Sequence, residues 1–154
     1  GTLRSHFPTR DDLDRAIVER MTSEVRLPDL SIFEGARRIE DRLERLVRAS
    51  GIFMDQARRL YRMWLREPML TAPWTEKGEE YGRRWDELMR TAIAPMENHE
   101  AMAILRAVLH PDFFDAVKAG RRSTDEASTL IAALITPWFT ARATRRVRRH
   151  ERRG

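Results

Sequence analysis

The sequence predicts an all-α fold, and three observations carry that prediction. Apolar residues recur three and four positions apart along most of the chain, which is the spacing of one face of a helix. No segment alternates apolar and polar residues as a half-buried strand does, and no Asn-Gly or Asp-Gly pair marks a β-hairpin. Helix-capping residues and prolines then divide the 154 residues into six segments of helical length.

The first two predicted helices cover residues 9–27 and 31–51. Thr9 is expected to cap the first helix, which ends before Pro28 because proline disfavours the helical conformation in the residue before it. Ser31 and Glu34 have the spacing of a capping box, and Gly51 is the predicted stop. The apolar stripes are Leu13, Ile17, Met21 and Val25 in the first helix and Ile32, Ala36, Ile39, Leu43, Leu46 and Val47 in the second.

The third and fourth predicted helices contain most of the aromatic residues. The third runs from about Phe53 to the residue before Pro68, and the fourth runs from about Trp74 to Ala94, where Pro95 closes it. Their apolar positions are Phe53, Ala57, Leu60, Tyr61, Trp64 and Leu65, and Tyr81, Trp85, Leu88, Met89 and Ala92.

The last two predicted helices are the most apolar part of the chain. One opens near Asn98, is split or kinked at Pro111, and ends at Gly120. The other begins with the capping pair Ser123 and Glu126 and is expected to bend at Pro137. Residues 127–139 contain no charge, so this face must be buried in the core or against another subunit.

The net charge of +5 comes from one end of the chain. Residues 142–154 hold seven arginines and one glutamate, a sum of +6, so the other residues sum to −1. The basic tail suits either nucleic-acid phosphate or simply a solvated helix end, and the second interpretation is favoured. The chain has no cysteine and no apolar run of 18 residues, so neither disulfides nor a transmembrane helix is expected. A cytoplasmic location is therefore expected.

Residues 1–13 resemble a known pattern. Gly1, Thr2, Leu3, Phe7 and Pro8, with Leu13, match the end of the DNA-binding domain in the TetR (Tet-repressor) family of bacterial transcription regulators. His6 stands where the family has His or Tyr, Arg10 stands for its usual Lys, and Arg4 replaces its usual Tyr. The resemblance implies a TetR-like helical ligand-binding and dimerisation domain, with the end of a helix-turn-helix head at the N-terminus. It also implies that most of that head precedes Gly1.

The resemblance and the residue types together give a set of expected DNA contacts. Short polar side chains on a recognition helix reach base edges, and a helix N-terminus with a neighbouring cation receives a backbone phosphate. The expected DNA-binding residues are Thr2, Arg4, Ser5, His6, Thr9 and Arg10.

Two further sets follow from the aromatic and apolar residues. Aromatic and methionine side chains suit an adaptable apolar pocket, and the family architecture implies one among the second, third and fourth helices. The expected pocket residues are Phe53, Tyr61, Trp64, Trp74, Tyr81, Trp85 and Met89. Ordinary core packing is the alternative for each of them. The expected dimer interface, some of it shared with the core of the chain, is Phe113, Phe114, Leu130, Ile131, Leu134, Ile135, Trp138 and Phe139.

No catalytic or metal-binding pattern is present. The four histidines are scattered, and His110, next to Pro111 and Asp112, is interpreted as a helix cap. No nucleophile elbow or glycine-rich phosphate loop occurs, so neither enzyme activity nor a cofactor or metal is expected.

These expectations define a three-part chain and a function. Residues 1–26 would end the DNA-binding domain and form the connecting helix, 27–141 would bind ligand and dimerise, and 142–154 would form the arginine-rich tail. The predicted function is a ligand-responsive regulator, most simply a repressor that a small apolar inducer releases from a palindromic operator. The alternative is a helical interaction module whose arginine tail binds nucleic acid or an acidic partner without an inducer. No membrane partner is expected.

Overall fold

The computed structural model describes residues 6–66, 71–96, 98–120 and 122–151, with backbone alone at 63–66 and 145–151. Within these residues the protein is all-α, as the sequence predicted, and no strand occurs. The elements are α2 (Arg10–Thr22), the 3-10 turn η1 (Leu30–Phe33), α3 (Ile39–Arg66), α4 (Ala72–Ile93), α5 (His99–Val108), α6 (Pro111–Lys118) and α7 (Thr124–Glu151).

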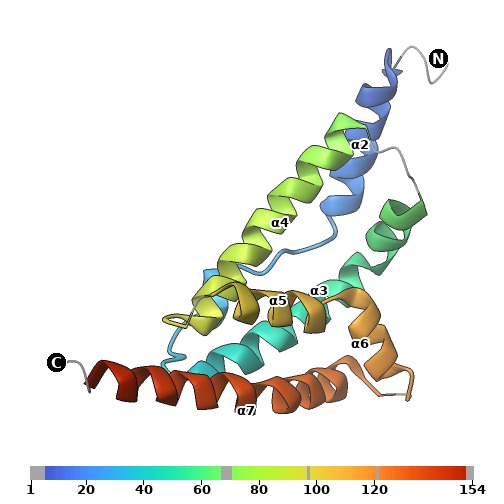
Figure 1. The fold of residues 1–154 in the computed structure, drawn as a ribbon. Helices are drawn as coiled ribbons and strands as arrows, with labels where there is room; N and C mark the ends of the chain where they lie inside the picture. The colour runs from blue at the N-terminus through green and yellow to red at the C-terminus, as the bar shows by residue number, and fades with distance from the viewer. Residues whose placement is uncertain (1–5, 67–70, 97, 121, 152–154) are drawn as a thin grey trace.

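The helices pack around two separate apolar clusters. Helix α3 crosses the molecule and packs along α7, while α2 lies beside α4 at the other end (Figure 1). The larger cluster joins α3, α4, α5, α6 and α7 and includes the fully buried Leu46, Leu105 and Phe139. The smaller cluster contains Val18, Leu60, Trp74 and Tyr81, and it holds α2 against α3 and α4.

Local hydrogen bonds place the end of α2 earlier than the sequence predicted. The hydroxyls of Thr22 and Ser23 donate to the carbonyls of Val18 and Arg20, at 2.8 Å each. These bonds satisfy carbonyls of the last turn, and the helix stops at Thr22. Val25, predicted as the last residue of the helical stripe, lies beyond the helix but remains buried.

The predicted helix start at Ser31 is wrong. Asp29, rather than Ser31, provides the cap, because its carboxylate accepts from the amide of Ser31 at 2.8 Å and begins only the short turn η1. Gly35 then adopts a φ of 74°, a left-handed conformation that ends helical continuation and that glycine accepts without strain. Arg45 fixes the turn to α3 by donating to the carbonyls of Ile32 and Glu34.

The predicted stop at Gly51 is also wrong, because α3 runs through it as one helix of 28 residues. Gly51 lies where α3 packs closely against α7 and α6. A Cβ atom at this position would lie 2.7 Å from the Ser128 hydroxyl oxygen and 3.1 Å from the Phe114 ring. The glycine therefore serves close helix packing rather than helix termination.

The remaining boundaries agree with their sequence signals. Ser123 and Glu126 form the predicted capping box, with bonds of 2.7 and 3.1 Å. The chain breaks between α5 and α6 at His110 and Pro111, and the His110 ring caps α6 as predicted. Helix α7 continues through Pro137 to Glu151, so the backbone of the arginine-rich segment is helical up to that residue. Among the described helices none combines the length and apolar content that a bilayer crossing requires.

Candidate ligand-binding cavity

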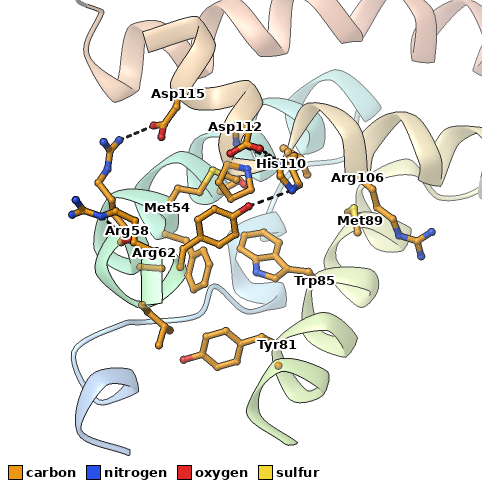
Figure 2. Close-up of a pocket in the computed structure, with 18 residues that line it drawn as sticks. Met54, Arg58, Arg62, Tyr81, Trp85, Met89, Arg106, His110, Asp112 and Asp115 are labelled. Atoms are coloured by element: carbon orange, nitrogen blue, oxygen red, sulfur yellow. Dashed lines mark hydrogen bonds and ion pairs between the residues drawn. The ribbon is translucent and has the colours of Figure 1, made fainter. Parts of the chain in front are cut away.

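A cavity of about 920 Å³ lies between the two apolar clusters, which is large enough for a drug-sized molecule. Three walls surround it: the middle of α3, one face of α4, and the junction of α5 with α6 (Figure 2). The lining residues are Ser50, Phe53, Met54, Ala57, Arg58, Leu60, Tyr61 and Arg62 of α3, Gly78, Tyr81, Trp85 and Met89 of α4, and Arg106, Leu109, His110, Pro111, Asp112 and Asp115.

The inner wall is aromatic and apolar. The ring of Phe53 meets the rings of Tyr81 and Trp85 edge to face, with centroid distances of 5.9 and 5.2 Å. Edge-to-face packing holds these rings in defined positions, while Met54 and Met89 add flexible, polarisable surface. This wall suits an apolar ligand body and provides shape rather than charge.

The rim formed with α5 and α6 carries the charged groups. Arg58 donates to the Asp115 carboxylate at 2.8 Å, and Arg106 pairs with Asp86 through contacts of 3.1 Å to each carboxylate oxygen. Figure 2 shows His110 and Asp112 at this end of the cavity and Tyr81 at the other. The charged groups of the rim thus lie largely in pairs, at the opposite end from Tyr81.

Tyr61 and His110 form a polar contact within the cavity lining. The Tyr61 hydroxyl lies 3.4 Å from Nε2 of His110, and Nδ1 of the same ring accepts the Asp112 amide at 3.3 Å. Because a backbone amide can only donate, this contact favours Nδ1 as an acceptor over the longer 3.6 Å contact from Nδ1 to the Asp112 carboxylate, and the neutral ring then carries its proton on Nε2. That proton is donated to the Tyr61 oxygen, which leaves the Tyr61 O–H free to donate elsewhere.

The surroundings keep this hydroxyl protonated. Burial, and then the negative charges of Asp112 and Asp115, raise the pKa of Tyr61 above its usual value. Burial likewise raises the pKa of Tyr81 at the other end of the cavity. Both phenols are therefore neutral hydrogen-bonding groups at physiological pH.

Five of the seven residues expected in a pocket line this cavity: Phe53, Tyr61, Tyr81, Trp85 and Met89. Trp74 does not line it and instead packs in the smaller cluster. The side chain of Trp64 lies outside the described residues. The sequence reasoning missed the third wall, at residues 106–115, although the helix break at His110 and Pro111 marks where an irregular junction exposes polar groups.

The expected DNA-binding residues are only partly described. Thr2, Arg4 and Ser5 lie outside the described residues. Thr9 forms a capping box with Asp12, accepting its amide at 3.1 Å. Arg10 is exposed and lies 3.5 Å from the Asp14 carboxylate, and His6 is exposed. The hydrogen bonds of Asp12, first to the Thr9 side chain and then to its backbone, lower the pKa of that carboxyl.

The expected dimer residues separate into two groups. Phe114, Ile131, Ile135 and Phe139 are at most 4% exposed and belong to the larger cluster, so they serve the core of the chain and are not available to a partner. Phe113 and Trp138 are half-buried, and Arg142 covers the Trp138 ring at 4.1 Å. Leu130 and Leu134 are 46% and 63% exposed on the outer face of α7.

The part of the chain that the structure describes contains no group of three or more His, Asp or Glu side chains that would hold a metal ion. Comparisons with protein-family models, curated protein sequences and solved structures found no match for this chain.

Proposed function

We propose that the protein is a ligand-responsive transcription regulator of the TetR type, in which a small, mostly apolar molecule in the cavity releases a dimer from operator DNA. The single observation that best supports this is the position of the cavity. Leu60 and Tyr81 of its lining also pack against α2, the helix in which the DNA-binding resemblance ends, so a ligand has a short physical route to that segment.

That route consists of side chains shared between the cavity and the smaller cluster. Leu60 and Tyr81 line the cavity and also pack in the cluster that contains Val18 of α2. One turn before Val18 in α2, the Asp14 carboxylate accepts the Thr71 hydroxyl at 2.7 Å, just before α4. A ligand that shifts α4 would therefore bias the position of α2. The size of this bias is limited by the difference between the ligand's affinities for the two arrangements of α4 and α2.

The outer face of α7 supports the dimer. Leu130, Ala133, Leu134, Pro137 and Ala141 are all exposed and recur at helical spacing, and no charged residue occurs between Glu126 and Arg142. Exposed apolar stripes of this kind are typical of protein interfaces. A second copy is the proposed occupant, because a two-fold axis places this apolar face against itself.

A binding selection from random DNA with the complete native protein tests this function. The expected product is a palindromic site, and alanine substitutions at Thr2, Arg4 and Ser5 should abolish its specific binding. Removal of residues 142–154 should leave the selected sequence unchanged, since phosphate contacts carry little sequence information.

The opposite outcome favours the helical interaction module. In that case the tail deletion would remove all DNA binding, while substitutions at residues 2, 4 and 5 would change nothing. The pairing of Arg142 with Glu100, at 2.5 and 2.9 Å, already commits the first arginine of the tail to the body of the protein.

A further inference from the structure

We propose, on the basis of the proposed ligand response, that the cavity selects an electrically neutral ligand that has an apolar body and one hydrogen-bond acceptor, such as a ketone or ester carbonyl. Tyr61 would donate to that acceptor. Three features of the cavity favour such a ligand: the direction of one hydrogen bond, the pairing of charges at the rim, and the chemistry of the inner wall.

The direction of the hydrogen bond makes Tyr61 a donor toward the ligand. The Asp112 amide favours Nδ1 of His110 as an acceptor, so Nε2–H donates to the Tyr61 oxygen. One lone pair of that oxygen is thereby occupied, and the hydroxyl proton is left to point elsewhere. A buried or half-buried hydroxyl without a partner is costly, so a ligand acceptor at this position is favoured over an apolar group.

The pairing of charges disfavours an ionic ligand. The rim has three arginines, Arg58, Arg62 and Arg106, and two carboxylates, Asp112 and Asp115. Arg58 pairs with Asp115, and Arg106 pairs with Asp86 just outside the lining, so these two arginines already have a counter-charge. A carboxylate or ammonium ligand would lose its hydration without gaining a full counter-charge, whereas a carbonyl loses much less.

Arg62 adds only a weak attraction for an anion. Its side chain is exposed, and its Nε donates to the Arg58 carbonyl within the same helix at 3.4 Å. Water screens a charge in such a position, so it attracts an anion weakly. It is nevertheless the residue by which an acidic ligand would be recognised if the inference were wrong.

The inner wall defines the rest of the ligand. Phe53, Trp85 and Met89 present ring edges and faces and a thioether to the cavity, with Trp85 and Met89 visible in Figure 2. These groups gain most from an aromatic or long aliphatic body that fills the space between the two clusters. The polar end of such a molecule would then reach the rim beside Tyr61.

Three matched probes test the inference: hexanophenone, hexylbenzene and a phenylhexanoic acid, each titrated while tryptophan fluorescence is followed. Trp85 in the cavity wall is the reporter. We expect the ketone to bind about two- to tenfold more tightly than the alkylbenzene, as for one net hydrogen bond, and more tightly than the acid. Tyr61→Phe should remove the preference for the ketone and leave the binding of hexylbenzene unchanged.

Tyr81→Phe is the matched control, because it deletes a phenol hydroxyl at the other end of the same cavity and should retain the preference. The inference is overturned if the ketone and the alkylbenzene bind equally, or if the preference survives Tyr61→Phe. It is also overturned if the acid binds most tightly and Arg62→Gln abolishes that binding. Each of these outcomes leaves a ligand in the cavity, whereas a failure of all three probes to bind the wild-type protein would contradict the ligand response itself.

Discussion

The outer face of α7 gives the sharpest test of the proposed dimer. The perturbation is Leu134→Glu, which places a charge in the middle of the exposed apolar stripe. Leu134 is 63% exposed in the single chain, and full burial of a leucine side chain contributes about 1.5–3 kcal/mol. Covering the exposed part is then worth about 1–2 kcal/mol per copy and about 2–4 kcal/mol per two-fold dimer.

This free energy sets the expected size of the effect. Its loss should raise the dimer dissociation constant by about 30- to 1,000-fold, and the buried glutamates would weaken association further. Sedimentation velocity over a range of protein concentrations measures the constant directly. Because residue 134 is exposed and glutamate is a good helix former, the monomer should keep its fold and its thermal stability.

Leu30→Glu is the control, since Leu30 is 43% exposed on η1, away from the α7 stripe. It should leave the dimer unchanged. The reasoning would be refuted by a wild-type protein that stays monomeric throughout the concentration range, or by a Leu134→Glu protein that dimerises as the wild type does.

Three further predictions concern helix packing, capping and coupling. Gly51→Ala should destabilise the protein by about 1–3 kcal/mol in denaturant unfolding, because its Cβ would lie 2.7 Å from the Ser128 oxygen. Gly82→Ala, with nothing within 4 Å of the new Cβ, should stabilise the protein by up to about 1 kcal/mol. Equal effects would show that the contact at Gly51 is unimportant. Thr9→Ala should cost about 1 kcal/mol at neutral pH. The Thr9 side chain lowers the pKa of Asp12, so the Asp12 carboxylate binds a proton less readily in the folded state than in the unfolded state. The stabilisation by the ionised carboxylate is present above the ordinary aspartate pKa and is lost as the pH falls through the lower pKa of the folded state. The stability of the Thr9→Ala variant should therefore depend less on pH below about 4. Val18→Ala should leave ligand affinity within about twofold but weaken ligand-induced release of DNA, since it loosens the packing of α2 against Tyr81; an unchanged release curve would remove this contact from the coupling route.

The all-α class and several helix limits could be predicted because their signals are local. The capping pair Ser123 and Glu126 lies within one turn, and the helix break at Pro111 is signalled by the proline itself, although Pro137 lies inside α7 without ending it. Gly51 could not be interpreted from local sequence, because a glycine that ends a helix and a glycine that allows another helix to pack closely have the same sequence signal. The neighbour is Ser128, which is distant in sequence, so only the packed structure distinguishes the two cases.

The walls of the cavity also differ in how far the sequence predicted them. Its aromatic wall could be predicted, because large aromatic and methionine side chains on adjacent helices have few places to lie. Its third wall could not, because His110 and Asp115 approach Tyr61 and Arg58 only through the angle between α6 and α3. Trp74 was expected to line the cavity but packs in the smaller cluster, because residue type alone does not distinguish a cavity-lining aromatic residue from a core residue.

The continuity of α3 has a consequence for how any signal crosses the molecule. At about 1.5 Å per residue, its 28 residues form a single rod of about 42 Å. One part of it is held tightly against α7 at Gly51, and Leu60, farther along, belongs to the cluster that holds α2. A ligand that touches α3 between these points meets a body that resists bending. In the proposed ligand response, the part that moves would then be α4, with α3 as the fixed reference.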